Sequence, residues 1–242
     1  MPRVANAVLA LLLLAPAGCG DDPNTEGLVV LAASSLTEAF TDLARDFERA
    51  HAGVRVQLRF DGSSALVRSL AQGAPGDVLA TADEPSMASA GFAVTDPQPF
   101  ASNRLVIAVP ADSTRVGDIT DLARSDVDVV VCAATVPCGR AAAEVLRRAG
   151  VSARIRSYEG NVRAVLTKVA SGEADAGLVY ATDVRTAAGE VRAIDVPVRA
   201  AVTTTCTIAV VSSSSRQARA AEFVALVRAD REVLTGYGFG AP

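Results

Sequence analysis

The sequence predicts an α/β protein built as two lobes around a cleft. Apolar runs rich in valine alternate with amphipathic segments along most of the 242 residues, a pattern typical of largely parallel sheets flanked by helices. Two breaks divide it, at residues 97–99 and in the threonine run 203–205. A chain that leaves one lobe near the first break and returns near the second crosses twice, which makes a hinge. We therefore expect lobe 1 at residues 28–104 plus 206–242, and lobe 2 at residues 105–205.

Short apolar runs bounded by turn residues predict the strands. The first run, LVVL at residues 28–31, is apolar throughout, as in a strand buried on both faces. We expect strands at residues 28–33, 54–60, 77–82, 104–109, 127–133, 176–181 and 205–211.

Amphipathic segments predict the helices, because their apolar residues recur at intervals of three or four. Leu36, Phe40 and Leu43 follow this spacing in the first segment. We expect helices at residues 35–51, 64–72, 84–90, 118–124, 139–149, 161–171, 216–229 and 230–236.

The N-terminus has the features of a secretory signal peptide at residues 1–18. A positive residue precedes the apolar run 7–15, and small residues follow. The apolar run is far shorter than the roughly 20 residues that span a bilayer, which argues against a retained transmembrane helix.

The residues after the signal peptide predict a lipid anchor. Cys19 follows Ala-Gly as in a bacterial lipobox, although Pro16 departs from the usual leucine. We expect a lipidated Cys19 with a polar tether at residues 19–27, and the alternative is ordinary cleavage nearby. The expected location is the periplasm or the outer face of the cytoplasmic membrane, with membrane contact only through the lipid.

The charge balance argues against a nucleic-acid partner. The chain has 23 lysines and arginines against 27 aspartates and glutamates, and its single lysine is Lys168. Phosphate backbones are bound by clustered basic residues, which this chain lacks. Aromatic residues make up 4% of the chain, so stacking platforms for sugars or bases are also poorly supplied.

The histidine and cysteine inventory argues against an enzyme and against a metal-cation site, so we expect no catalytic residue. A Ser-His-Asp hydrolase needs a base beside its nucleophile, and the only histidine, His51, stands at the polar end of a predicted helix. Cysteines 132, 138 and 206 form no CxxC pair of the kind that binds zinc.

The cysteines after the signal peptide suggest one disulfide. In an exported protein, Cys132 and Cys138 are expected to bridge across the loop 133–137 and stiffen it. The alternative is a thiol or redox pair, because a helix start could lower the pKa of the Cys138 thiol. Cys206, in a valine-rich strand, is expected to be a buried apolar residue.

Four strand-to-helix junctions carry small or polar residues. They lie at Ser34-Ser35, in GSS at residues 62–64, in PCG at residues 137–139 and at Asn161. Each helix start offers unpaired amides and about half a positive charge, which suits an anion. For any one junction, helix capping is the simpler interpretation, and Ser35-Leu36-Thr37-Glu38 fits a capping box. Four such starts facing one cleft could hold an anion without lysine or arginine.

The motifs LAASSLTEAF, FDGSSALVRSLAQGAPGDVLATAD, VPCGRAAAEVL, NVRAVL and GLVYATD occur in an order and spacing that resemble a known family. The family is the periplasmic molybdate-binding proteins of bacterial molybdenum ABC importers. The resemblance covers roughly residues 28 to 239. It implies the two-lobed periplasmic-binding-protein fold (type II), with a mainly parallel sheet in each lobe and the ligand in the cleft.

The resemblance also implies a ligand, a partner and a set of contacts. The ligand would be molybdate or tungstate, with no cofactor, and the partner would be the membrane permease of an ABC importer; we expect a monomer. The implied ligand-binding residues supply hydroxyl groups or backbone amides. They are Ser35, Ser63, Cys138, Val162 and Tyr180.

One departure from the family pattern leaves another tetrahedral oxyanion, phosphate or sulfate, open as the alternative ligand. Molybdate, tungstate and sulfate carry no proton at neutral pH, so their site should present only donors. Asp61 stands two residues before Ser63, where the family commonly has a small or hydroxyl residue. A carboxylate pointing into the cleft would favour a protonated ligand such as phosphate. We expect Asp61 to face the surface and cap its own turn.

Overall fold

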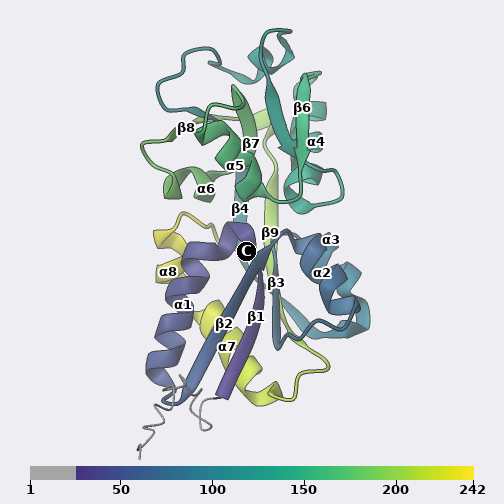
Figure 1. The fold of residues 1–242 in the computed structure, drawn as a ribbon, viewed down its shortest axis with the longest axis vertical. Coiled ribbons are helices and arrows are strands. Elements are labelled where there is room, and N and C mark those ends of the chain that lie inside the picture. Colours follow the sequence, from purple (N-terminus) through teal and green to yellow (C-terminus); the bar gives the residue numbers. More distant parts are fainter. Residues whose placement is uncertain (1–25) are drawn as a thin grey trace, which may run out of the picture.

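The computed structural model describes residues 26–242 and shows two lobes, one above the other (Figure 1). The predicted signal peptide at residues 1–18, Cys19 and nearly all of the tether 19–27 lie outside the described residues. Across residues 26–242, none of the helices combines the length and the apolar character needed to cross a bilayer.

The sheet of lobe 1 holds five strands in the order β2-β1-β3-β9-β4. The first three are parallel to one another, whereas β9 runs antiparallel to both β3 and β4. Their bounds are β1 Glu26–Ala33, β2 Val54–Asp61, β3 Val78–Thr81, β4 Val94–Pro110 and β9 Thr203–Val211.

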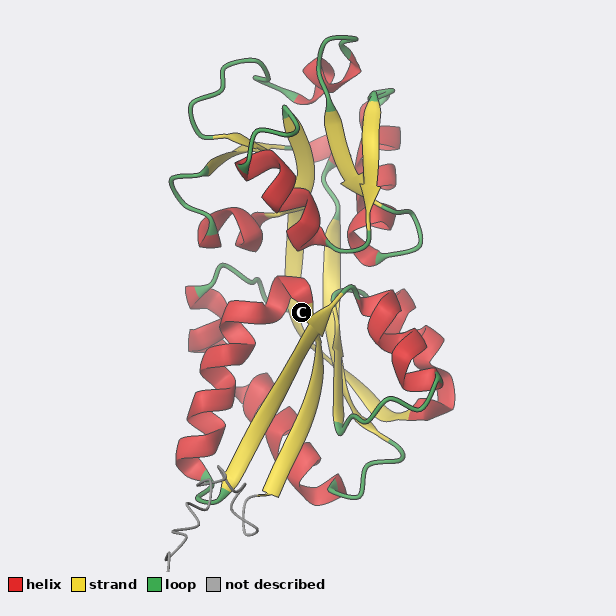
Figure 2. Ribbon diagram, viewed as in Figure 1, coloured by secondary structure: helices red, strands yellow, loops and turns green. Residues whose placement is uncertain are grey.

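Helices cover both faces of this sheet (Figure 2). Phe40 and Phe47 of α1 pack edge-on against Phe223 of α7 on one face, while Leu66 of α2 and Met87 of α3 belong to a second apolar cluster on the other. The helices and 3₁₀ turns of lobe 1 are η1 Ser34–Leu36, α1 Thr37–Ala50, α2 Ser63–Ala71, α3 Glu84–Ala90, η2 Gly91–Ala93, α7 Gln217–Ala229 and α8 Arg231–Gly236.

Lobe 2 repeats the plan on a smaller scale. Strand β5 pairs in parallel with β6 and β7, and the second half of β4 pairs antiparallel with β7 and β8. The elements of lobe 2 are η3 Ile119–Ala123, β5 Val129–Cys132, α4 Pro137–Ala149, β6 Ile155–Glu159, α5 Val162–Ala170, β7 Ala176–Tyr180, α6 Ala181–Thr186, β8 Val191–Asp195 and η4 Val198–Ala200.

Two long strands, β4 and β9, connect the lobes (Figure 1). Strand β4 changes sheet between Arg104, which pairs with Thr203 of β9, and Leu105, which pairs with Tyr180 of β7. The backbone between these residues therefore links two sheets that, within residues 26–242, share only strand β4. We propose residues 28–104 plus 206–242 as lobe 1 and residues 105–205 as lobe 2.

The two-lobed α/β architecture agrees with the sequence prediction, but several details differ from it. Strands β4, β8 and β9 are antiparallel to their neighbours, so each sheet is mixed. Helix α6 was not predicted. Strands β6 and β8 were not expected, because buried and exposed residues alternate along them instead of forming an apolar run. The helix expected at 118–124 is the 3₁₀ turn η3.

Strand β4 also begins ten residues before the expected residue 104. Its first half was not predicted because it contains two prolines, which are unfavourable inside a strand. Pro97 and Pro99 lie at two register shifts against β9. Proline is tolerated there because the first half of β4 is an edge strand with bulges.

Candidate functional site

A small pocket lies between the lobes and collects all five residues implied as ligand contacts. It is lined by the starts of η1, α2, α4 and α5 and by the end of β7, and encloses about 210 Å³ of space that includes its opening to solvent. The predicted residues on its wall are Ser35, Ser63, Cys138, Val162 and Tyr180.

Two hydroxyl groups on the wall are buried without a hydrogen-bond partner. Ser35 Oγ and Tyr180 Oη both lack one among the described residues, although Ser35 is only 4% and Tyr180 only 1% exposed. Burial, together with the nearby Cys206 and Asp83, raises the pKa of the Tyr180 phenol well above its ordinary value, against the opposing effect of the Thr204 hydroxyl, although the two hydroxyls do not have the geometry of a hydrogen bond. The phenol therefore keeps its proton and can donate it to a ligand.

Ser63 supplies a third hydroxyl, and its orientation is fixed by a neighbour. Its Oγ accepts a hydrogen bond of 3.0 Å from the backbone amide of Ala82, at the end of β3. A serine hydroxyl has one hydrogen to donate, so that hydrogen remains available for the pocket. Ser63 is 1% exposed and stands at the first position of α2.

Cys138 and Val162 bring backbone amides from lobe 2. Cys138 is the second residue of α4, after Pro137, and Val162 is the first residue of α5. The first amides of a helix have no partner within it. Asn161 caps α5 by accepting from the amide of Ala164 at 3.0 Å, which leaves the Val162 amide for a ligand.

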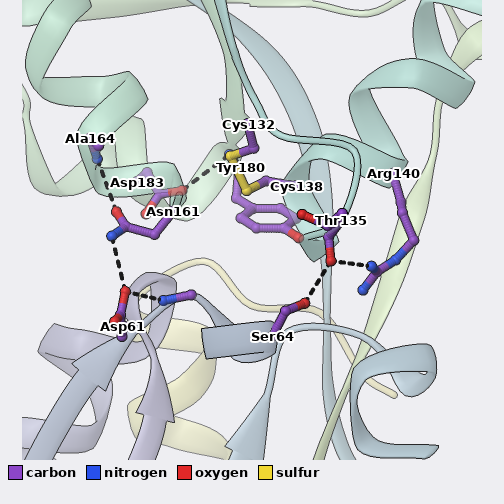
Figure 3. Close-up of a disulfide and its surroundings, with 11 residues drawn as sticks. Asp61, Ser64, Cys132, Thr135, Cys138, Arg140, Asn161, Ala164, Tyr180 and Asp183 are labelled. Carbon is purple, nitrogen blue, oxygen red and sulfur yellow. Dashed lines mark hydrogen bonds between the residues drawn. A yellow bond between two sulfur atoms is a disulfide. The ribbon is translucent and has the colours of Figure 1, made fainter. Parts of the chain in front are cut away.

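Beside the pocket, a disulfide closes the loop that precedes α4. Cys132 at the end of β5 is bonded to Cys138, with 5.6 Å between their Cα atoms. Figure 3 shows the bridge next to the Tyr180 ring. The remaining cysteine of residues 26–242, Cys206, is fully buried, and this burial raises the pKa of its thiol to about 12. Neither arrangement supplies the accessible thiolate that a thiol enzyme needs.

The capping box expected at Ser35 is wrong. Residues Ser34–Leu36 form a 3₁₀ turn, and no side chain caps either it or α1. Thr37 Oγ1 donates to the Ser34 carbonyl at 2.7 Å, while the Glu38 carboxylate pairs with Arg163 of lobe 2. The serine hydroxyl is thus not used by the helix. Ser34 lies on the pocket wall as well.

Asp61 stands at the mouth of the pocket. Its side chain is exposed, and Oδ1 accepts from the Gly62 amide at 2.7 Å, as expected of an aspartate that caps its own turn. The same oxygen lies 3.3 Å from Asn161 Nδ2 across the cleft. Figure 3 shows Asp61 below Asn161, and Ser64 below Thr135. Asp61 therefore joins the lobes at the edge of the pocket.

The pocket wall carries no arginine, lysine or histidine among the described residues. Two arginines that follow pocket residues in α4 and α5, Arg140 and Arg163, have no role predicted from the sequence. Each follows an amide donor, Cys138 or Val162, by one or two residues, and that spacing was the available signal. Both arginines pair with carboxylates of lobe 1, Asp83 and Glu38.

Asp183 is a buried carboxylate beside Tyr180. Its Oδ2 accepts from the Tyr180 amide at 3.1 Å, and its Oδ1 lies 3.3 Å from Arg163 Nε. Burial raises the pKa of Asp183 to about 7, against the opposing effects of Arg163 and of the bond to Tyr180. This carboxylate fixes the backbone at the end of β7, where the phenol enters the pocket.

Comparison with known proteins shows similarity to one family over nearly all of the described chain. Residues 28–240 match the family described as bacterial extracellular solute-binding protein. The molybdate-binding protein ModA of Mycobacterium tuberculosis is 39% identical over 229 residues, which cover 92% of this chain and 88% of the relative.

Two solved structures share the fold. The periplasmic molybdate-binding protein of Azotobacter vinelandii has a TM-score of 0.79 at 22% identity, covering 89% of this chain and 99% of its own. The sulfate-binding protein SubI of Mycobacterium tuberculosis has a TM-score of 0.77 at 18% identity, covering 88% of this chain and 86% of its own. At such identities the likeness concerns the fold alone.

Proposed function

Since the chain belongs to the bacterial extracellular solute-binding protein family, we propose that it captures molybdate between its lobes and delivers it to the permease of an ABC importer. The relative that is 39% identical binds molybdate by its name. Tungstate, which has nearly the same size and charge, is proposed as a second ligand. Ser35, Ser63, Cys138, Val162 and Tyr180 are the proposed contacts.

The observation that carries this proposal is the pair of buried hydroxyls without partners. An unsatisfied buried hydroxyl costs about 1–3 kcal/mol, so Ser35 and Tyr180 both gain when an acceptor enters the pocket. A fully ionised tetrahedral oxyanion has acceptors on every oxygen and no donor. The amides of Cys138 and Val162 and the hydroxyl of Ser63 complete a wall made mainly of donors.

The proposed mechanism is lobe closure without catalysis. Ser35 and Ser63 belong to lobe 1, whereas Cys138, Val162 and Tyr180 belong to lobe 2. An anion can contact both sets only when the lobes are closed, so its binding favours the closed state. The shape of the closed protein then distinguishes loaded from empty molecules for the permease.

Export and anchoring are proposed from the sequence. Residues 1–18 would direct export, and acylation of Cys19 would hold a monomer at the outer face of the cytoplasmic membrane. The mass of the mature chain tests this, because a mature N-terminus without an acylated Cys19 contradicts it.

Thermal unfolding tests the ligand. Molybdate or tungstate at 100 times its dissociation constant should stabilise the folded protein by about 2.7 kcal/mol. For a chain of this size, that corresponds to a rise in melting temperature of about 5 to 10 °C. Sulfate and phosphate at the same concentrations serve as controls. A rise with either control and none with molybdate or tungstate contradicts the proposed specificity.

A second candidate ligand is phosphate, because Asp61 lies on the pocket wall. Phosphate keeps a proton near neutral pH and could donate it to that carboxylate. The substitution Asp61→Asn distinguishes a molybdate site from a phosphate site. It removes the charge of the side chain and keeps an oxygen that can accept a hydrogen bond from the Gly62 amide. A molybdate site should bind its ligand equally well or roughly two- to fivefold more tightly after this change, because a like charge is removed.

Calorimetric titration of the Asp61→Asn protein with molybdate and with phosphate measures this effect. Asp112→Asn, at an exposed position of lobe 2, is the control for the change in net charge. If Asp61→Asn weakens molybdate binding more than Asp112→Asn does, the carboxylate supports the ligand and the proposed role of Asp61 is wrong.

A further inference from the structure

Two arginines reach across the cleft from the helices that offer amides to the pocket. Arg140 lies in α4, two residues after Cys138, and Arg163 lies in α5, directly after Val162. Both arginines make ion pairs with lobe 1. Neither lines the pocket, so their charges face carboxylates and not the ligand.

Arg140 holds α4 against the start of α3. Its Nε and Nη2 lie 3.0 and 2.7 Å from Asp83 Oδ2, and Nη2 donates to Ser86 Oγ at 2.8 Å. Asp83 is 6% exposed, and it directly follows Ala82, whose amide fixes the Ser63 hydroxyl. The Asp83 carboxylate is therefore largely withdrawn from solvent, while the Arg140 side chain remains 34% exposed.

Arg163 makes the corresponding contact on the other side of the pocket. Its Nη2 donates to the Glu38 carboxylate, and its Nε donates to the Ser34 carbonyl at 3.3 Å. Two groups of lobe 2 hold the guanidinium in place: Thr186 Oγ1 at 3.0 Å and Asp183 Oδ1 at 3.3 Å. Arg163 is thus fixed within its own lobe and extends two bonds to the other.

The bond to Ser34 bears directly on a proposed ligand contact. The Ser34 carbonyl and the Ser35 amide belong to one peptide group, and none of the described peptide bonds is cis. In a trans peptide the C=O and N–H bonds point in opposite directions. An arginine bound to the carbonyl therefore keeps the Ser35 N–H directed away from itself, and Ser35 is on the pocket wall.

We propose that Arg140 and Arg163 are positioning residues that latch the lobes closed over the anion, with Arg163 also orienting the Ser34-Ser35 peptide. This inference rests on the proposed function. Each arginine lies within one helix turn of an amide donor. Closure of the lobes therefore forms the ligand contacts and the interlobe ion pairs of the arginines together. Two interactions that require the same closed state strengthen each other, by about 5- to 150-fold in affinity for typical coupling.

Single substitutions test the latches in the full-length mature protein. Arg140→Gln and Arg163→Gln should each raise the dissociation constant for molybdate by about 5- to 150-fold, mainly through faster release. Arg163→Lys, which keeps the charge but not the fork of donors, should fall between Arg163→Gln and the unchanged protein. Calorimetry measures the affinity, and stopped-flow measurement of tyrosine fluorescence measures the release rate, since the chain has three tyrosines and no tryptophan.

The matched controls are basic residues of the same two helices that pair within lobe 2. Arg147→Gln on α4 breaks a pair with Glu144, and Lys168→Gln on α5 breaks a pair with Glu159. Both should leave affinity within about twofold of the unchanged protein, because each of these pairs lies within lobe 2 and does not depend on lobe closure. Equal effects from latch and control variants overturn the proposal.

A double-mutant cycle separates a latch from a purely structural role. Glu38→Gln and Arg163→Gln remove the two partners of one interlobe pair, so their effects on affinity should not add: the second change should cost much less once the first is made. Additive effects overturn the assignment of Arg163. Circular dichroism melts confirm that each variant is folded before its affinity is compared.

X-ray scattering covers the case in which the unchanged protein binds none of the four oxyanions. The ligand-free Arg140→Gln/Arg163→Gln protein should then have a larger radius of gyration than the unchanged protein. That result would refute the proposed function and uphold the latch. An equal radius of gyration in that case overturns both.

Discussion

Replacing Gly62 with alanine is expected to raise the dissociation constant for molybdate more than 100-fold while leaving the fold intact. A Cβ atom on Gly62 would lie 2.4 Å from the carbonyl oxygen of Gly160, which belongs to the backbone of the other lobe. Carbon and oxygen atoms do not approach so closely, so the lobes of the variant cannot close as they do in this structure. The conformation of Gly62, with φ −61° and ψ 135°, is open to alanine.

The expected size follows from the contacts that closure brings. Without closure, the amides of Cys138 and Val162 and the hydroxyl of Tyr180 stay away from an anion held by lobe 1. Each bond to a charged group contributes about 1.5–3 kcal/mol. Losing two of them already exceeds 3 kcal/mol, which is more than about a hundredfold in affinity.

Gly160→Ala is the matched control, since it alters the facing loop by the same single methyl group. A Cβ atom on Gly160 meets no atom within 4 Å. Its affinity should stay within a few-fold of that of the unchanged protein, as measured by calorimetric titration, and both variants should melt near the unchanged temperature. If Gly62→Ala binds molybdate as tightly as Gly160→Ala does, the closed arrangement described here is not the binding state.

The position of the interlobe pocket could be predicted from the sequence because the residues proposed as its donors follow the ends of strands. Ser35, Ser63, Cys138 and Val162 each follow a β-strand and open a helix or a 3₁₀ turn. Ligands bind in α/β sheets at such carboxyl ends, so local patterns predicted the kind of site. Tyr180 carried no comparable signal, and only the family resemblance indicated its role.

The sequence could not predict which contacts join the lobes, because these depend on residues far apart in the chain. Arg163 meets Glu38, 125 positions away, and Arg140 meets Asp83, 57 positions away. A local pattern instead favoured a capping box for Glu38, and the interlobe ion pair displaced it. Tertiary contacts between the lobes overrode the local preference of Glu38.

The electrostatics of the cleft follow from the same arrangement. Backbone amides and hydroxyls supply the pocket with donors, while the nearby guanidinium groups of Arg140 and Arg163 are occupied by carboxylates. On the proposed function, a dianion would meet fixed dipoles at four chain segments and not a formal positive charge. Such a wall favours acceptor-only ligands, and the size of the closed pocket is left to distinguish among them.

Removing the hydroxyl of Ser35 or Tyr180 is expected to weaken ligand binding and to leave the ligand-free protein equally or more stable. Each hydroxyl is buried without a partner in the described structure, a state that costs about 1–3 kcal/mol. Ser35→Ala and Tyr180→Phe remove that cost from the empty protein. With molybdate bound, each loses a bond to a charged acceptor, which corresponds to about 10- to 150-fold in affinity.

Urea unfolding without ligand and calorimetric titration with molybdate measure the two effects separately. Unchanged or higher stability without ligand, together with weaker binding of molybdate, indicates a ligand contact. Removing a hydroxyl with a structural role would instead lower the stability of the ligand-free protein. Ser34→Ala is the control for Ser35→Ala, since Ser34 lies beside it on the pocket wall but is proposed to act through its carbonyl, which the substitution keeps. Equal losses of affinity in the two serine variants would show that Ser35 is not the specific contact, and a Tyr180→Phe protein that is less stable but binds normally would remove the phenol from the site.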